Sequence, residues 1–471
     1  MKRFLLFSSL LITLSGCSSW VSMITPTTPS MKAPSQGWRI PEGFKLATPS
    51  DTKIEGAWWE IYQDPLLNDL EKRVEKANQT LAQADAQYRQ ALAALGIAGA
   101  ALSPTASLSV SGSRSQQPIL TTGGLANPPA SNLYQLTGQV SWEPDFWGAI
   151  HASVASAEAT RQASFANRGA VLLSLQSQAA IDYLQLRLAD ANIRLLENTV
   201  EAYAKSLELT ERRFKSGVAG RSDVTQAITQ SETAKASLAD ARINRAALEH
   251  ALAVLIGESA TDFKMSPQAW KPISWPTVPL GVPSTLLERR PDIANAQRQV
   301  ISAAEKLNVD EAAFFPVVTL SASAGFESKQ ARSWFSLPKS LWSLGPQITQ
   351  YLLDGGNRTA TRDQQLAVLD QAAANYREVV LESFQSVEDN LSALIWLDEE
   401  IARQKLADDA ARETLDMVNR MYTSGTVSYL NVITAQTALL SAESSLFTIE
   451  SRKAAAHVQL IKALGGGWGG G

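Results

Sequence analysis

The sequence predicts a mainly α-helical protein with membrane β-strands, built from two structural repeats in each chain. Three observations support this fold class. The chain matches itself when it is shifted by 208 residues, and each copy contains a proline-free stretch long enough for a helix of about 65 residues. Each copy also contains segments in which polar and apolar residues alternate. Helices of this length cannot belong to a compact globule.

The N-terminal segment has the pattern of a lipoprotein signal. A positively charged start is followed by an apolar run that ends at Leu14, and two small residues precede Cys17, the single cysteine of the chain. We therefore predict a signal peptide over residues 1–16, with a diacylglyceryl group and an N-acyl group on Cys17. Ser18 follows that cysteine, which is typical of lipoproteins sorted to the outer membrane. A bare signal peptide with an incidental cysteine is the alternative.

Composition argues against several functions. The 471 residues carry a formal net charge of −4 and show no stripe of lysine and arginine, so no nucleic-acid partner is expected. His151, His250 and His457 are isolated, which argues against a metal site. No nucleophile elbow, phosphate-binding loop or dinucleotide fingerprint occurs. We expect neither an enzyme nor a cofactor, and the covalent lipid is the one predicted attachment.

The internal repeat defines the domain organisation. Gly217 falls on Gly425 at the shift of 208 residues, and further upstream Pro104 corresponds to Pro316 with a small change in spacing. After the signal peptide we expect an acylated N-terminal segment, the first repeat, a linker, the second repeat and a glycine-rich tail. Their predicted bounds are 17–64, 65–260, 261–284, 285–465 and 466–471.

Each repeat is predicted to contain a long antiparallel helical hairpin. No proline occurs over residues 148–214 or 358–422, so each stretch can form one helix of roughly 100 Å. Glycine turns near residues 217 and 425 follow, and shorter helices return from Asp223 and Asn431, the two candidate N-caps. Apolar residues along these helices are sparse and small, which is typical of coiled-coil packing. A long dimerising coiled coil is the alternative interpretation.

The segments between the helices alternate like β-strands. We expect strands at about 104–113, 134–143, 317–326 and 343–351, each with one apolar face and one face of serine, threonine or glutamine. Their length and alternation match outer-membrane barrel strands, although a soluble sandwich also alternates. Pro346 weakens the last strand. Aromatic residues suited to a membrane interface lie near the strand ends or in the loops, namely Trp142, Trp334, Phe335, Trp342 and Tyr351.

The number of strands predicts an oligomer. Four strands cannot close a barrel, and an open sheet edge is not tolerated in hydrocarbon, so several chains must share one barrel. Two chains would supply eight strands and a lumen too narrow for transport. Three chains would supply twelve strands around an open lumen, and the helical hairpins would continue it as a tube.

Four segments resemble the outer-membrane efflux factor family, the TolC-like, NodT-type outer-membrane lipoproteins, and the resemblance covers nearly the whole mature chain. They are 58–70 (WWEIYQDPLLNDL), 141–148 (SWEPDFWG), 286–293 (LLERRPDI) and 422–436 (YTSGTVSYLNVITAQ). The resemblance implies a homotrimer with a 12-stranded β-barrel in the outer membrane, continuous with a long α-helical barrel in the periplasm. Segments 17–64 and 261–284 would then contribute to an equatorial region around the helical barrel.

The same resemblance implies the outer-membrane component of a tripartite efflux system. Such a component is a passive exit duct for drugs or other small toxic compounds, gated at its periplasmic end. It is surrounded by outer-membrane lipid and works with a periplasmic adaptor protein and an inner-membrane efflux pump. The adaptor would contact the hairpin turns, at Gly217, Gly220, Gly425 and Ser428.

Candidate gate residues follow from their positions in the family pattern. Leu430 would form a hydrophobic ring, whereas Asn431 and Thr434 stand where some relatives carry carboxylates, so an acidic constriction is not implied here. Tyr422 is a candidate for hydrogen bonds that close the gate. Arg221 and Asp223 supply the charges of the first turn. Alternatively, Asp223 and Asn431 only cap helices.

Two other functions stay open at this point. One is the outer-membrane component of a polypeptide secretion system. The other is a scaffolding lipoprotein without a channel, whose helices only associate. A duct requires the alternating segments to be embedded in the membrane, whereas a scaffold leaves them exposed to proteases.

Overall fold

The structure is a computed structural model. It describes residues 57–116, 118–121, 124–126, 129–268, 275, 290–333, 335 and 339–466. The predicted signal peptide, its acylation site Cys17 and most of segment 17–64 lie outside the described residues. So do Trp334, most of the glycine-rich tail, and the linker from residue 269 onward apart from Trp275.

The chain divides into two compact units, and each unit draws on both sequence repeats. One unit contains Gln87–Phe165 and Asn295–Arg377, and it includes every strand among the described residues. The other contains Ala166–Ala294 and Glu378–Gly471, together with the segment that ends at Ala86. The hairpin turns and the main hydrophobic core belong to this second unit.

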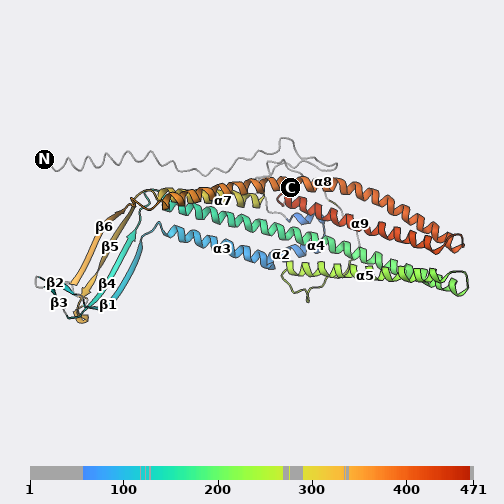
Figure 1. Ribbon diagram of the computed structural model, residues 1–471, viewed down its shortest axis with the longest axis horizontal. Helices are drawn as coiled ribbons and strands as arrows, with labels where there is room; N and C mark the ends of the chain where they lie inside the picture. The colour runs from blue at the N-terminus through green and yellow to red at the C-terminus, as the bar shows by residue number, and fades with distance from the viewer. Residues whose placement is uncertain are drawn as a thin grey trace. The chain divides into compact units, whose positions relative to one another are not determined.

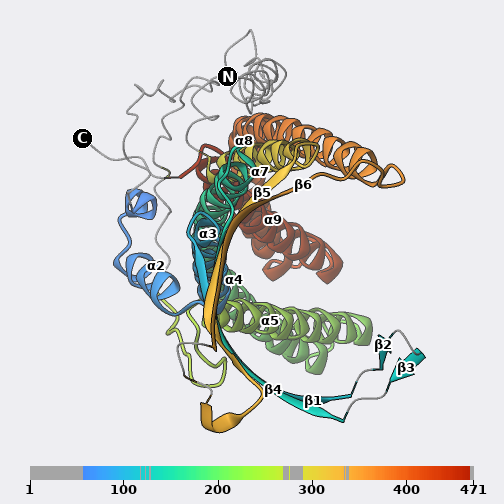
Figure 2. The same ribbon diagram turned by 90° about the vertical axis from the view of Figure 1, so that its left-hand side faces the viewer.

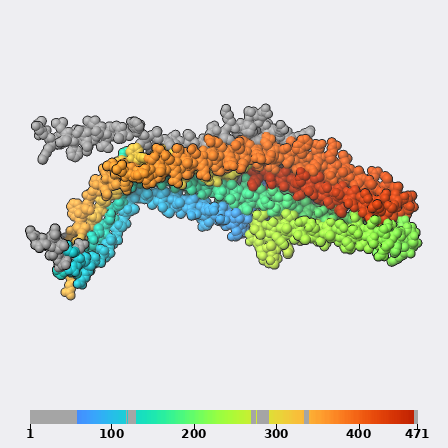
Figure 3. All heavy atoms as spheres, in the orientation of Figure 1, coloured from blue at the N-terminus to red at the C-terminus, as the bar shows by residue number. Residues whose placement is uncertain are grey.

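Two helical hairpins dominate the chain (Figure 1). The long helices α4 (Ala149–Lys215) and α8 (Asn357–Thr423) have 67 residues each, as the absence of proline predicts. The return helices α5 (Arg221–Leu255) and α9 (Tyr429–Ala463) have 35 residues each. In the space-filling view the atoms of α9 lie against those of α8 toward the turn, so the hairpin is packed without an intervening layer (Figure 3). No helix among the described residues is apolar enough over a sufficient length to cross a bilayer.

The buried face of α5 explains why these helices pack closely. Its buried residues repeat at intervals of three and four and are mostly small: Val224, Ala227, Ser231, Ala234, Leu238 and Ala241. This is the heptad spacing of a coiled coil, and alanine allows two helix backbones to approach one another. The predicted coiled-coil packing is confirmed.

Shorter helices begin beside the ends of the return helices in both repeats. In the first repeat, α2 (Pro65–Ala77) is followed by α3 (Gln79–Ala100), and Asn78 lies between them. The Asn78 side chain donates to the carbonyl oxygen of Leu255 at 2.8 Å and accepts from the N–H of Leu81 at 3.0 Å. One side chain therefore pairs with a backbone carbonyl oxygen at the end of α5 and with a backbone N–H group in the first turn of α3.

The second repeat uses an arginine at the corresponding joint. Helix α7 (Pro291–Ala312) begins beside the end of α9, where the Arg290 guanidinium donates to the carbonyl oxygen of Ala463 at 2.8 Å. The same guanidinium pairs with Asp292 at 2.6 Å. A cation at the C-terminus of α9 also complements the helix dipole.

Four antiparallel strands form the main sheet, in the order β1-β4-β5-β6. They are β1 (Thr105–Ser115), β4 (Ser131–Trp142), β5 (Val317–Ser328) and β6 (Ser340–Thr349). Figure 2 shows them following one curved surface, with the short ribbon of β2 (Ile119–Thr121) and β3 (Gly124–Ala126) beyond β1 and β4. The polar composition of the loop between β1 and β4 did not predict that ribbon. The 3-10 helix η3 (Ala331–Ser333) lies in the connection from β5 to β6.

The strand register places the apolar residues on one face. Val140 lies opposite Ala106 on one side and Ala322 on the other, and Ala322 lies opposite Leu344. The intervening residues are polar, as in the 2.8 Å contact between the hydroxyls of Ser323 and its cross-strand partner Ser343. The apolar face is open, because Leu108, Leu344 and Ile348 are 73%, 77% and 68% exposed. Such a face suits a membrane.

The aromatic residues expected at a membrane interface are exposed where the structure describes them. Trp342, Phe335 and Tyr351 have 79%, 67% and 66% of their surface exposed. Trp142 at the end of β4 donates its indole N–H to the carbonyl oxygen of Leu102 at 3.0 Å. Pro346 lies within β6, opposite Leu320 of β5, so the proline that was expected to weaken this strand does not end it.

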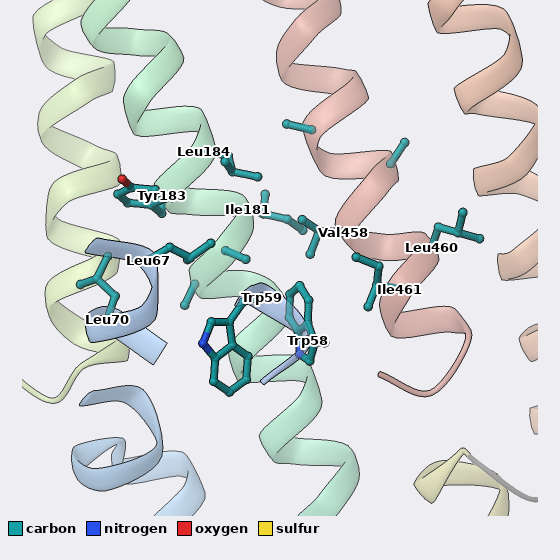
Figure 4. Packing of buried hydrophobic residues seen from close by; sticks show 14 of the residues in the cluster. Trp58, Trp59, Leu67, Leu70, Ile181, Tyr183, Leu184, Val458, Leu460 and Ile461 are labelled. Carbon is teal, nitrogen blue, oxygen red and sulfur yellow. The ribbon is translucent and has the colours of Figure 1, made fainter. Parts of the chain in front are cut away.

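The largest hydrophobic core surrounds the middle of α4 and the end of α9 (Figure 4). The 3-10 helix η2 (Trp58–Tyr62) and helix α2 pack against these helices through bulky apolar side chains. The labelled contributors are Trp58, Trp59, Leu67, Leu70, Ile181, Tyr183, Leu184, Val458, Leu460 and Ile461. Large side chains gather here, whereas mostly small ones form the buried face of α5 toward its turn.

Candidate functional site at the paired hairpin turns

The two hairpin turns have the same backbone structure. Gly217 and Gly425 adopt left-handed φ angles of 77° and 79° at the ends of α4 and α8. In both turns the residue after the glycine donates its backbone N–H to the carbonyl oxygen five residues earlier. Val218 donates to Arg213 at 2.9 Å, and Thr426 donates to Met421 at 3.0 Å. This Schellman arrangement closes the last turn of each helix and favours glycine.

The predicted N-caps of the return helices are wrong. Helix α5 begins at Arg221 with Gly220 as N-cap, and α9 begins at Tyr429 with Ser428 as N-cap. Asp223 and Asn431 instead occupy the third helical position. The Asp223 carboxylate accepts from the Gly220 N–H at 3.4 Å, as the third residue of a capping box does. The predicted N-cap of α5 therefore lies three residues too far along the chain.

Asn431 pairs with the residue that precedes its helix. The Ser428 hydroxyl donates to the Asn431 side-chain oxygen at 3.0 Å, which ties the turn to the first turn of α9. The Thr434 hydroxyl donates to the carbonyl oxygen of Leu430 at 2.9 Å. Asn431 and Thr434 are exposed and Leu430 is 57% exposed, so the three side chains form one accessible face at the start of α9.

Arg213 links the two hairpins. Its guanidinium donates from Nη1 to the backbone carbonyl oxygen of Tyr422 at 2.7 Å, and its central carbon lies 4.5 Å from the centre of the Tyr422 ring. The bond therefore joins the last turn of α4 to the last turn of α8. Sequence reasoning did not find Arg213. The repeat contained a signal, since Arg213 falls on Met421 at the 208-residue shift and the two repeats therefore differ in charge at this position.

Tyr422 and Tyr429 form the centre of a small apolar cluster beside this link. Both are buried with Ala227 and Val432, and their ring centres are 5.4 Å apart. The Tyr429 hydroxyl contacts the hydroxyl of Ser206 at 3.1 Å, and burial raises the pKa of Tyr429. α4 therefore holds both helices of the second hairpin.

Tyr422 contributes its ring and its carbonyl oxygen to this cluster. Within the part of the chain that the structure describes, its buried hydroxyl has no hydrogen-bond partner. The hydrogen-bonding role expected for that hydroxyl is thus not seen in the single chain. Among the charges of the first turn, the Arg221 guanidinium lies 5.9 Å from the centre of the Phe214 ring and is exposed.

The residues expected to meet a partner lie at the tips. Gly217, Gly220, Gly425 and Ser428 are all exposed. Val218 beside them is 66% exposed, which makes the first tip partly apolar. No group of acidic, histidine or cysteine side chains among the described residues could hold a metal ion.

An open apolar sheet joined in one chain to paired helical hairpins defines the subunit of an outer-membrane channel. A family model described as "Outer membrane efflux protein" matches residues 70–258 and 282–466, and the chain belongs to that family. The family resemblance seen in the sequence is thereby confirmed. Members are outer-membrane channel proteins rather than enzymes, and this chain is the outer-membrane channel component of an efflux system.

Two curated relatives match the chain over nearly its whole length. The "Pyoverdine export outer membrane protein OpmQ" of Pseudomonas aeruginosa is 31% identical over 476 residues, which cover 99% of this chain and 97% of the relative. The "Toluene efflux pump outer membrane protein TtgC" of Pseudomonas putida is 29% identical over 455 residues, which cover 97% and 93%.

Solved structures confirm the fold class. The outer-membrane channel OprN superposes with a TM-score of 0.83 at 26% identity, over 94% of this chain and 100% of that one. Such neighbours are trimeric channels with a β-barrel and an α-helical barrel, so the predicted architecture of a mainly helical chain with membrane strands is confirmed.

Proposed function

We propose that three copies of this chain form a passive exit duct that is closed at the α8–α9 turns in its resting state. One observation supports this most directly. Arg213 of the first hairpin holds the end of α8 through the Tyr422 carbonyl oxygen at 2.7 Å. Opening then requires the second hairpin to separate from the first, which breaks this bond and exposes the cluster around Tyr429.

Leu430, Asn431 and Thr434 are the proposed constriction. They share the exposed face at the start of α9, and none of them takes part in the contacts that join the hairpins. In a trimer with this face toward the axis, Leu430 supplies an apolar ring while the neutral side chains of Asn431 and Thr434 supply hydrogen-bonding groups. A constriction of this composition excludes hydrated ions without attracting cations.

The proposed partners are a periplasmic adaptor protein and an inner-membrane efflux pump. The exposed tips at Gly217 and Gly425 offer two similar surfaces in each chain, which would give six around a trimer. Energy is spent at the inner membrane, and the duct follows its partners passively. We further propose that Cys17 carries the lipid that anchors the protein in the outer membrane.

The proposed cargo is small toxic compounds, drugs among them. The names of the relatives support small molecules, since one exports pyoverdine and the other toluene. Export of polypeptides has no corresponding support among these relatives. The exposed apolar sheet also argues against a scaffold without a channel, because it needs a membrane to cover it.

The test is native mass spectrometry of the detergent-solubilised protein combined with ion conductance in planar bilayers. The proposal expects a trimer with small, mostly closed conductance. A Leu430→Ser substitution should raise that conductance, whereas Ile243→Ser, at an exposed apolar position on α5 away from the turns, should not. A monomer, a dimer or a trimer that is fully open at rest would overturn the sealed duct.

A further inference from the structure

Among the described residues, the outer strands of the sheet, β1 and β6, each have a neighbouring strand on one side only. β1 is exposed along its whole length, and Val110 on β1 and Ile348 on β6 are 64% and 68% exposed. An edge strand presents backbone N–H and C=O groups, and these groups must be paired where the sheet lies in hydrocarbon. In a trimeric barrel the partner of β6 is β1 of the next protomer. Which residues of β6 and β1 lie opposite one another depends on the register of the two strands.

The sequence repeat supplies the missing register. β1 matches β5 at a shift of 212 residues, which aligns Leu108 with Leu320. β4 matches β6 at a shift of 208, which aligns Gln139 with Gln347. The two shifts agree with the observed strand pairs. Leu108 lies opposite Gly138 in the first repeat, and Leu320 lies opposite Pro346 in the second. Gly138 and Pro346 are 208 residues apart, as the shift between β4 and β6 requires.

The chain itself contains one junction between repeats. β4 of the first repeat pairs with β5 of the second, and there Val140 lies opposite Ala322. The junction between protomers is the equivalent one, because β6 of the second repeat meets β1 of a first repeat. In the repeat, Val140 corresponds to Ile348 and Ala322 corresponds to Val110.

We propose that β6 of each protomer pairs antiparallel with β1 of the next, with Ile348 directly opposite Val110. The same register sets Thr349 opposite Ser109, as Ser141 is opposite Ser321 within the chain. This inference rests on the trimeric channel proposed above.

The chemistry of the resulting pairs supports the register. Ile348 and Val110 are both apolar and both belong to the open apolar face, while Thr349 and Ser109 place two hydroxyls on the polar face. A slip of one residue would set apolar side chains against polar ones. Slips of two residues keep the faces matched, and they would place Leu108 or Gly112 opposite Ile348 instead.

Paired cysteines test the register in the assembled trimer. Directly opposite residues have Cβ atoms about 4.5–5.5 Å apart, and diagonal neighbours are about 7–8 Å apart, so only the correct pair oxidises readily. The variant Val110→Cys/Ile348→Cys is compared in membranes with two shifted pairs, Leu108→Cys/Ile348→Cys and Gly112→Cys/Ile348→Cys. Each is oxidised mildly and run on a denaturing gel.

The controls separate register from assembly. Val140→Cys/Ala322→Cys repeats the experiment at the known junction inside the chain and must form an intramolecular disulfide. Single variants account for Cys17, the one native cysteine. The pair Ser109→Cys/Thr349→Cys tests the same register if the first pair does not assemble. Native mass spectrometry of every variant shows whether the trimer forms.

The proposal expects a covalent trimer from Val110→Cys/Ile348→Cys, with about tenfold less crosslinking from either shifted pair. A trimer that crosslinks through a shifted pair would overturn the register while leaving the duct intact. A trimer that crosslinks through none of these pairs would also overturn it, since the internal control shows that opposite cysteines oxidise. Absence of a trimer in the native protein would instead contradict the proposed function.

Discussion

The Arg213 guanidinium holds the backbone carbonyl oxygen of Tyr422 at 2.7 Å and lies over the ring of the same residue. One side chain of the first repeat thus engages both the backbone and the side chain of the second. A hydrogen bond from a charged donor is stronger than a neutral one, and here it competes less with water because Tyr422 is buried. Arg213 is therefore one contact between the two hairpins that a mutation can remove.

Replacing Arg213 with methionine should loosen the closed state. Loss of a charged hydrogen bond costs about 1.5–3 kcal/mol, which corresponds to roughly a tenfold or greater shift toward the open state. Single-channel recording in planar bilayers measures the open probability. Arg212→Met is the matched control, because that side chain on the same helix is exposed and pairs with Glu208 one turn earlier. Equal open probabilities for both variants would contradict the linking role of Arg213.

Glu71 on α2 should make stability depend on pH. Its side chain is fully buried, and neither carboxylate oxygen has a partner among the described residues. Burial raises the pKa of Glu71 from 4.5 to about 9, so the folded protein keeps it protonated while the unfolded chain ionises it. The resulting penalty is absent below pH 4.5 and grows as the pH rises toward 9. At pH 7 it amounts to roughly 3 kcal/mol.

A Glu71→Gln substitution should remove this dependence. The variant should gain stability at pH 7 but not at pH 4, as measured by denaturant unfolding of the solubilised protein between pH 4 and pH 8. Glu75→Gln on the exposed side of the same helix is the control. If the two variants and the native protein share one pH profile, Glu71 is not buried as a neutral acid.

Gly257 should tolerate alanine much less well than Gly217 does. Both glycines have left-handed φ angles, 72° and 77°, which cost alanine about 1–2 kcal/mol. At Gly257 a Cβ atom would also lie 2.3 Å from the carbonyl oxygen of Ala77, whereas at Gly217 it meets open space. We expect a loss of roughly 3 kcal/mol or more for Gly257→Ala and about 1 kcal/mol for Gly217→Ala. Equal losses in denaturant unfolding would show that α2 moves aside freely.

Arg245 should be indispensable to the core between α4 and α5. Its guanidinium pairs with Asp190 at 2.7 Å and Glu249 at 2.9 Å, and the two acidic side chains are only 2% and 8% exposed. Arg245→Met would leave both carboxylates buried without their cation, at a cost of about 3–5 kcal/mol. Arg242→Met breaks an exposed pair with Glu197 and should cost at most about 1 kcal/mol in the same unfolding measurement. A small loss for both would mean that water reaches Asp190.

The sequence predicts the fold well because its main signals are periodic. The absence of proline before Phe214 and Tyr422 predicts the long helices, and alternation over residues 317–326 predicts β5, although that strand continues to Ser328. Periodicity describes which face of an element is buried, and it therefore predicts helices, strands and their faces. It does not report contacts between distant segments.

The parts that sequence reasoning missed depend on such contacts or on exact position. Arg213 meets Tyr422 across 209 residues, and no local pattern records that meeting. The error at Asp223 arose because N-cap and third helical positions both favour an aspartate, so composition alone leaves the start of α5 uncertain by three residues. The gate residues stay predictions, since their action belongs to the assembled trimer.

The joints at Asn78 and Arg290 have a consequence for the order of folding. The Asn78 bond to Leu255 spans 177 residues, and the Arg290 bond to Ala463 spans 173. Each joint closes a loop that contains a complete helical hairpin, and contacts so distant in sequence form slowly. The entropy of closing a loop varies only with the logarithm of its length, so the two joints face nearly equal closure costs. The two halves of the chain should therefore complete their joints at similar rates, with neither waiting on the other.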